Sequence, residues 1–141
     1  MNSEVSIISR SPKETIEFGK SLVQDARGGE VFALIGELGA GKTQIVKGAA
    51  IALGIEAEVT SPTFNIVHCY EAKNKTLYHI DLYRIEKLEG SLRLYIEEIL
   101  HSKEICFIEW PGSIEQLLPP WTQYWQISII SENERKIIRL R

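Results

Sequence analysis

The sequence has little of several features that define common classes of protein. Only two of its 141 residues are cysteines, and no C-x-x-C pair or nearby pair of histidines gives the spacing of a zinc site. No run of about 18 apolar residues is present to cross a membrane. The polar first ten residues also lack the pattern of a secretory signal. We therefore expect a cytoplasmic protein with no membrane association and no structural zinc.

An excess of positive charge is also missing. Sixteen lysines and arginines oppose nineteen acidic residues, which gives a net charge of -3 and an isoelectric point near 5.7. Proteins that hold nucleic acid directly usually present a basic face to the phosphate backbone. If RNA enters the function of this protein, we expect a partner to carry it.

Hydrophobic patterning predicts alternating strands and helices. A length of 141 residues fits one domain, spanning residues 1–141. A Ser-Pro-x-Glu capping pattern at residues 11–14 predicts the start of the first helix. Together these signals favour an α/β fold whose sheet is mostly parallel at its centre, with antiparallel edge strands and helices on both faces. Strands are predicted at 5–8, 31–35, 66–70, 77–80, 105–108, 124–130 and 136–140, and helices at 11–26, 42–53, 89–100 and 114–118.

A glycine-rich motif follows the apolar strand 31–35. Residues 36–43, GELGAGKT, match G-x-x-x-x-G-K-[ST] between a buried strand and an amphipathic helix, the context that this phosphate-binding loop requires. Backbone N–H groups curled around a triphosphate supply hydrogen bonds, and glycines permit the curl. Lys42 is expected to bridge the β- and γ-phosphates, and the Thr43 hydroxyl to ligate Mg²⁺. The expected ligand is ATP with Mg²⁺, held by Glu37, Leu38, Gly39, Ala40, Gly41, Lys42, Thr43 and Gln44.

Hydrolysis of the nucleotide needs acidic groups on the metal or on water, and two carboxylates stand at strand ends. Glu109 follows the apolar run 105–108 at the usual position of a Walker B acid. Asp81 ends the strand 77–80. The alternative for both is an acidic residue that only marks the end of a strand, or a helix cap in the case of Asp81. Asp81, Glu109 and Lys42 are therefore the candidate catalytic residues, with Thr43, Glu109 and Asp81 as candidate metal ligands.

Other polar and aromatic residues are compatible with more than one role. The segment 60–64 is either a switch that senses the γ-phosphate or a plain Ser-Pro turn. Residues 74–77 begin like the guanine-selective NKxD motif, but Leu77 replaces its aspartate, so the motif gives no support for guanine. His68 and His79 are expected to be structural, and both cysteines to be buried free thiols. The three tryptophans are expected to anchor a core, although Trp110 is also placed to border the site.

Four motifs in this order resemble the bacterial TsaE family, the ATPase component of tRNA threonylcarbamoyladenosine synthesis. They are GELGAGKT at 36–43, SPTF at 61–64, HIDLYR at 79–84 and IEWP at 108–111. The resemblance spans nearly the whole chain, and the last two motifs are far more selective than the phosphate loop. The segment 85–99 departs from the family, in which this stretch is more often rich in leucine and acidic residues.

The resemblance implies a compact P-loop ATPase that works with a TsaD–TsaB heterodimer. TsaD transfers the threonylcarbamoyl group to adenosine 37 of ANN-decoding tRNAs, so tRNA is reached indirectly through the complex. The ATPase is thought to reset that assembly between turnovers. By motif position, Thr63 belongs to the switch, Asp81 is the catalytic acid and Glu109 is the Walker B-like acid. Thr63 and Trp110 join the expected nucleotide contacts, and Arg84 faces the partner or the site.

Two other functions fit the phosphate loop. A small-molecule P-loop kinase needs an acceptor pocket and usually an arginine-bearing lid. This chain has few arginines between its two acidic strands and little length for a lid. The other alternative is a non-catalytic binding module, in which Asp81 and Glu109 only position Mg²⁺.

Overall fold

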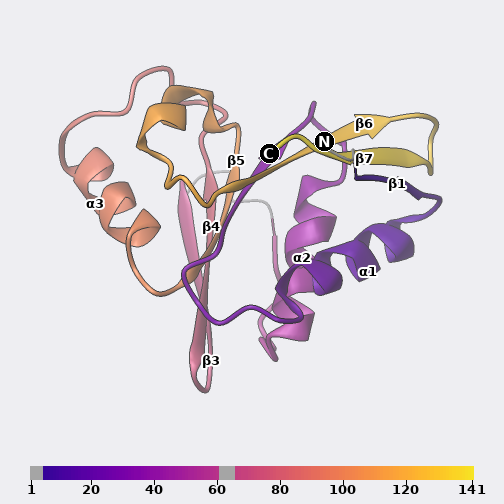
Figure 1. The fold of residues 1–141 in the computed structure, drawn as a ribbon, viewed down its shortest axis with the longest axis horizontal. Coiled ribbons are helices and arrows are strands. Elements are labelled where there is room, and N and C mark those ends of the chain that lie inside the picture. Colours follow the sequence, from indigo (N-terminus) through magenta and orange to yellow (C-terminus); the bar gives the residue numbers. More distant parts are fainter. Residues whose placement is uncertain (1–4, 61–65) are drawn as a thin grey trace.

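The computed structural model describes residues 5–60 and 66–141, and its centre is a twisted sheet of seven strands (Figure 1). Three α-helices and two short 3₁₀ turns accompany the sheet within the described residues. In chain order the elements are β1 (Ser6–Ser9), α1 (Pro12–Val23), β2 (Val31–Ile35), α2 (Lys42–Ala52), β3 (Val67–Ala72), β4 (Lys75–Asp81), α3 (Gly90–Leu100), β5 (Ile105–Glu109), η1 (Pro111–Ser113), η2 (Glu115–Leu117), β6 (Gln123–Ile129) and β7 (Arg135–Arg139).

The strands lie in the order β1-β7-β6-β2-β5-β4-β3. Pairing is parallel from β6 through β2 and β5 to β4, whereas β3, β7 and β1 join in antiparallel pairs. The predicted fold class is therefore confirmed, including its antiparallel edges. Because β2, β4 and β5 run parallel, their carboxyl ends meet at one edge of the sheet, where ligands bind in open α/β folds.

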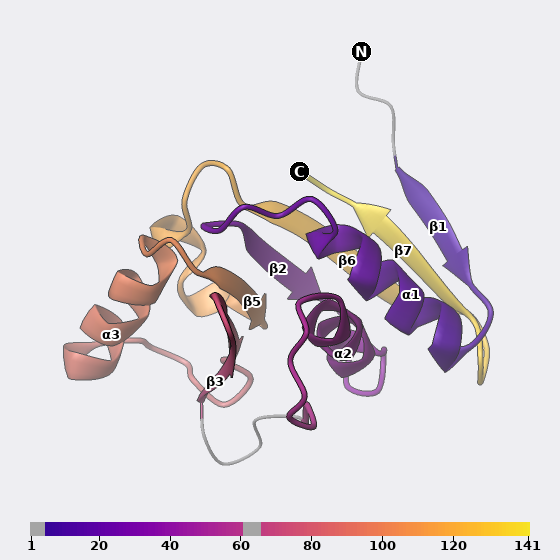
Figure 2. The ribbon, with the colours of Figure 1, turned by 90° about the horizontal axis from the view of Figure 1, so that it is seen from below.

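Each face of the sheet carries its own hydrophobic core, and Figure 2 shows α1 and α2 on one side of the sheet and α3 on the other. On one face α1 and α2 pack over side chains that include Phe32, Leu34 and Phe107. On the other face α3 packs over Val31, Ile80 and Ile108 together with the turns after β5. Alternation along β4 and β5 sends Leu77 and Phe107 to the α2 side and Ile80 and Ile108 to the α3 side. All five residues of β5 are buried, as a central parallel strand requires.

Helices α1 and α2 cross at two glycines. A Cβ atom at Gly19 would overlap the backbone carbonyl of Ile45, and one at Gly48 would overlap the carbonyl of Ile16. The two backbones therefore approach more closely than any larger side chain would allow. This contact fixes the first turn of α1 beside the start of α2, next to the phosphate loop.

Most predicted elements are present, and the departures are local. The predicted helix 114–118 is a pair of 3₁₀ turns, and the strands of the β3–β4 hairpin extend until only Lys73 and Asn74 separate them. The Ser11 hydroxyl caps α1 as expected, but the Glu14 carboxylate accepts the N–H of Arg10 rather than that of Ser11.

Two expectations about burial were wrong. Cys69 is exposed, because it lies on the outer edge strand β3, while Cys106 is buried as predicted. Trp121 follows the Pro119-Pro120 break and is 55% exposed, and its indole N–H donates to the carbonyl of Gly29. Trp125 does lie in the core, against Phe18.

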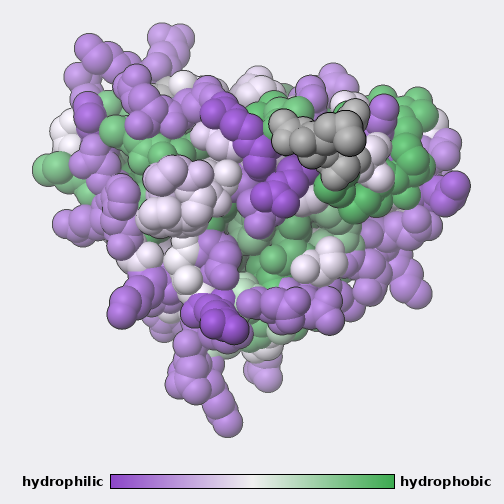
Figure 3. Space-filling model, in the orientation of Figure 1, coloured by the Kyte–Doolittle hydropathy of each residue, from purple (hydrophilic) through white to green (hydrophobic). Residues whose placement is uncertain are grey.

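Hydrophobic surface gathers over β1, β6 and β7, at the right of Figure 3, whereas polar residues cover much of the rest of that view. Exposed apolar side chains at this end of the sheet are Val5, Ile7, Ile8, Ile129 and Ile130. Within the described residues, no helix is long and apolar enough to cross a membrane.

Candidate functional site: a phosphate loop with two strand-end carboxylates

The predicted phosphate loop joins the carboxyl end of β2 to the first turn of α2. Gly41 precedes the helix with a φ of 105°, a left-handed conformation that glycine adopts at little cost. The first amide groups of a helix have no partner inside it, and the helix dipole adds positive potential at the same end. The local backbone therefore favours an anion at this position.

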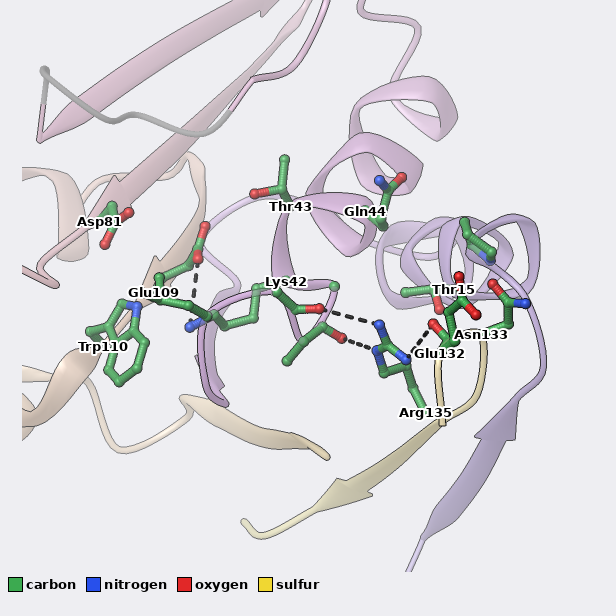
Figure 4. A pocket seen from close by; sticks show the side chains of 15 residues that line it. Thr15, Lys42, Thr43, Gln44, Asp81, Glu109, Trp110, Glu132, Asn133 and Arg135 are labelled. Carbon is green, nitrogen blue, oxygen red and sulfur yellow. Dashed lines mark hydrogen bonds and ion pairs between the residues drawn. The ribbon is translucent and has the colours of Figure 1, made fainter. Parts of the chain in front are cut away.

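A cavity of about 360 Å³ opens beside the loop (Figure 4). One wall is formed by residues 38–44, and a second by Asp81, Glu109 and Trp110 at the ends of β4 and β5. A third wall combines the start of α1 with the turn between β6 and β7. The structure thus brings together every predicted site residue from Leu38 to Gln44 with both acids and Trp110. Glu37 does not line the cavity, and Thr63 lies outside the described residues.

Lys42 is buried, with 4% of its surface exposed, and points from α2 toward the strand ends. Its ammonium group donates a 2.5 Å hydrogen bond to the carbonyl of Gly36 and lies 3.9 Å from Oε1 of Glu109. The same Nζ sits 3.7 Å from the centroid of the Trp110 ring, a cation–π distance. One cation therefore links the loop with the end of β5.

The two acids lie at equivalent positions on neighbouring strands. Asp81 and Glu109 are paired in the parallel register of β4 and β5, at the last residue of each strand. Oδ1 of Asp81 accepts the N–H of Tyr83 at 3.0 Å. One carboxylate oxygen of Glu109 is bonded to Nε2 of His79, and the other faces Lys42. The prediction that these acids stand at strand ends is confirmed, and the parallel pairing explains why they are close.

Burial dominates the electrostatics of the site. It lowers the pKa of Lys42 from its usual value, although the charges of Glu109 and Asp81 oppose that shift. It also raises the pKa of Asp81; the Tyr83 N–H opposes this shift, the Glu109 charge adds to it, and His79 and Lys42 oppose it more weakly. Titratable groups perturbed by burial and by one another inside a cleft are typical of functional sites.

Trp110 has an unusual backbone conformation. Its φ is 57° and its ψ is 58°, and it is the one non-glycine residue with positive φ in the part of the chain that the structure describes. Such a conformation costs a bulky residue about 1–3 kcal/mol and is often found at functional sites. The bend places the ring beside Lys42 and 4.9 Å from the ring of Tyr83. Trp110 thus borders the site, as the sequence allowed.

Sequence reasoning missed the wall that lies away from the acids. Pro12 and Thr15 of α1 line it together with Glu132, Asn133 and Arg135. The Arg135 guanidinium donates to the loop carbonyls of Ala40, at 3.0 Å, and Gly39, at 3.3 Å (Figure 4). No short motif marks this arginine, because it is 95 positions from Ala40 in sequence. Sequence reasoning also missed the contact of His79 with the site: this histidine, expected to be structural, hydrogen-bonds to Glu109, a predicted site residue.

Comparisons with known proteins agree on one family. The family model for threonylcarbamoyl adenosine biosynthesis protein TsaE matches residues 9–138. The chain is similar to tRNA threonylcarbamoyladenosine biosynthesis proteins TsaE of Treponema pallidum, at 36% identity over 92% of this chain and 96% of that protein, and of Bacillus subtilis, at 39% identity over 90% and 79%.

The solved structures give the same result. The crystal structure of Bacillus subtilis YdiB superposes with a TM-score of 0.79 and 32% identity, covering 99% of this chain and 86% of that one. The resemblance that four short motifs indicated thus extends over sequence and fold. The chain belongs to the TsaE family of threonylcarbamoyl adenosine biosynthesis proteins.

Proposed function

We propose that the chain binds ATP with Mg²⁺ on the loop and hydrolyses it in the service of tRNA threonylcarbamoyladenosine formation. The observation that carries the proposal is the convergence of Lys42, Asp81 and Glu109 on one cavity beside a phosphate-type loop. Membership of the family supports the pathway, and the geometry of the cavity supports the nucleotide. The kinase alternative has no comparable observation in its favour, and a measurement of ATP turnover distinguishes hydrolysis from the binding-module alternative.

The donor set fits Mg²⁺. This ion is usually held in nucleotide sites by one or two protein oxygens together with substrate phosphates and water. The Thr43 hydroxyl and the carboxylates of Asp81 and Glu109 line the same cavity and supply such oxygens. When bound, the ion would neutralise charge on the phosphates. Among the described residues no group of three or more His, Cys, Asp and Glu side chains forms a metal site by itself, and a phosphate-bound ion needs none.

Each side chain has a separate task in this proposal. Lys42 balances the negative charge of the β- and γ-phosphates, for which it must exchange its contact with the Gly36 carbonyl. Asp81 uses Oδ1 to bind the Tyr83 N–H, so we assign its other oxygen to the attacking water. Glu109 directs Oε1 toward Lys42 and the loop. Water attacks the γ-phosphorus and passes one proton to the free oxygen of Asp81, the bond from the γ-phosphorus to the β–γ bridging oxygen breaks, and ADP and phosphate leave.

The biological role is proposed from the membership of this chain in the TsaE family. In it, this chain resets or regulates a TsaD–TsaB heterodimer, and tRNA is reached only through that complex. The net charge of -3 supports the assignment, because a subunit that leaves RNA to its partners needs no basic face.

The test measures ATP hydrolysis by the purified protein, alone and with a TsaD–TsaB pair and tRNA. Wild type should support repeated rounds of tRNA modification, and its turnover should rise with the partners. Lys42→Ala should lose tight triphosphate binding and fail to support modification. Unchanged ATP affinity in that variant would overturn the loop assignment. ATP turnover that does not change when the partners are added, or repeated modification that does not depend on this chain, would overturn the proposed role, and phosphoryl-acceptor metabolites would then be screened.

A further inference from the structure

The surroundings of His79 differ from those of a side chain that only fills space in the hydrophobic core. It lies on β4 two residues before Asp81, and its exposed fraction is 0%. Its partner in the β4–β5 register is Phe107, so its side chain points to the α2 face, as the Glu109 side chain does. On that face Nε2 of His79 bonds directly to Oε2 of Glu109.

The chemistry of the two groups fixes the direction of this bond. In the ionised form, in which it would hold Mg²⁺, the carboxylate of Glu109 only accepts hydrogen bonds, so Nε2 of His79 carries the proton and donates it. In the neutral ring Nδ1 is then an acceptor, and it has no hydrogen-bond partner among residues 5–60 and 66–141. A buried polar atom without a partner is unfavourable and calls for an explanation. An apolar side chain would fill the position without that cost.

We propose that His79 is a positioning residue for Glu109, an inference that rests on the proposed nucleotide function. By binding Oε2, the imidazole restricts rotation of the carboxylate and holds Oε1 toward Lys42, 3.9 Å away. A glutamate has one more rotatable bond than an aspartate, so a Walker B-like acid of this length needs such a restraint. Residues that hydrogen-bond to a ligating carboxylate and orient it commonly control metal affinity and enzymatic activity.

A neighbouring histidine provides the matched control. His68 on β3 is the register partner of His79, but it is only partly buried and Nδ1 bonds to the hydroxyl of Tyr70. Within the described residues no hydrogen bond or ion pair joins it to Glu109, and it does not line the cavity. Substitution of His68 therefore disturbs the same hairpin without touching the carboxylate.

The experiment compares His79→Phe, His79→Gln and His68→Phe. Phenylalanine keeps the ring and removes the donor, whereas the glutamine amide restores a donor near the position of Nε2. For each variant, melting temperature, ATP dissociation constant with and without Mg²⁺, and kcat with the partners present would be measured. We expect His79→Phe to lower kcat at least tenfold and to weaken the Mg²⁺ dependence of ATP binding. ATP affinity without Mg²⁺ should change less than threefold, His79→Gln should recover much of the loss, and His68→Phe should resemble wild type.

A spectroscopic test is independent of nucleotide. Imidazole ¹⁵N spectra of the metal-free protein should show Nε2 protonated and Nδ1 bare, with a strongly deshielded Nε2 proton that moves upfield in Glu109→Gln. A proton on Nδ1, or no change in Glu109→Gln, would overturn the proposal, as would equal losses in His79→Phe and His79→Gln. If wild type neither binds nor hydrolyses ATP while the spectra agree, the proposed function fails and the His79–Glu109 bond stands alone.

Discussion

The Nε atom of Arg135 donates a 3.0 Å hydrogen bond to the backbone carbonyl of Ala40, across 95 residues of sequence. Other nitrogens of the same guanidinium bond to the carbonyls of Gly39, Ser131, Glu132 and Glu134. One side chain therefore ties the β6–β7 turn to the tip of the phosphate loop. Because the planar group presents its donors in fixed directions, it holds both segments in one geometry.

Replacing Arg135 should loosen the loop. Arg135→Ala removes the contacts to Gly39 and Ala40, and hydrogen bonds from charged donors contribute about 1.5–3 kcal/mol each to stability at most. We expect ATP affinity to fall about tenfold and the free energy of unfolding to fall by about 1–3 kcal/mol. Arg135→Lys should rescue little, since a lysine cannot reproduce the fork. Titration calorimetry and urea unfolding would measure both quantities.

The control for this prediction is Arg139→Ala. Arg139 is exposed on the same strand and bonds to the carbonyl of Arg141, away from the loop. Arg139→Ala removes one positive charge, as Arg135→Ala does, so a general electrostatic effect on ATP binding would appear in both variants. Equal losses in the two would show that the ties to the loop are unimportant.

The two acids should affect turnover more than binding. Asp81→Asn and Glu109→Gln keep side-chain size, and the loop amides and Lys42 remain to hold the phosphates. We expect kcat to fall about 100-fold or more, because orientation of water and metal in the transition state is lost. ATP affinity should change much less. Single-turnover hydrolysis with a parallel binding titration makes the comparison, and equal losses of binding and turnover would argue that the acids are structural.

Asp81 should also give stability a distinctive pH dependence. Burial raises its pKa above the usual 3.8. An acid with a raised pKa in the folded state stabilises the fold below pH 3.8, and this contribution is lost as pH rises through the folded pKa. At pH 7 the ionised carboxylate therefore costs stability, which asparagine avoids. In metal-free buffer, the melting temperature of Asp81→Asn minus that of wild type should be larger at pH 7 than at pH 4.

The matching variant is Glu71→Gln, which alters a carboxylate on the edge strand β3, outside the cavity. The difference in melting temperature between Glu71→Gln and wild type should not increase from pH 4 to pH 7 as that of Asp81→Asn does. A difference for Asp81→Asn that stays constant from pH 4 to pH 7 would mean that Asp81 titrates as in the unfolded chain.

Local patterns predicted the parts of this molecule that short segments determine. The run 31–35, the glycine loop and Lys42 specify strand, turn and helix within thirteen residues, and that unit has the expected form. Asp81 and Glu109 could be placed at strand ends because each follows an apolar run. Their proximity required only that the two strands be parallel neighbours.

The remaining features depend on contacts between distant segments. In the sequence, nothing distinguishes Arg135 from arginines that simply lie on the surface. Its role is visible only once the β6–β7 turn has folded against the loop. His79 occupies a position at which an apolar residue also fits, so its role is visible only beside Glu109. The extent of burial is equally hard to read from the sequence: on α3, Tyr95 stands three positions after Leu92 and one before Ile96, at the spacing of an apolar face, yet it is 45% exposed. Periodicity identifies a face but not the extent of its cover.

The crossing of α1 and α2 predicts that a glycine-to-alanine substitution there changes stability in the direction opposite to the usual one. In the interior of a helix, glycine to alanine normally stabilises by up to about 1 kcal/mol. At Gly48 the added Cβ would overlap the Ile16 carbonyl, and backbone cannot move aside as a flexible side chain can. We therefore expect Gly48→Ala to destabilise the fold by about 1–3 kcal/mol in urea unfolding. It should also weaken ATP binding, because separation of the helices shifts the cavity wall at Thr15. Gly112→Ala, where nothing lies within 4 Å of the new atom, should leave both quantities near wild type. A stabilised Gly48→Ala would mean that the two helices have room to part, and that their crossing does not set the position of α1 at the site.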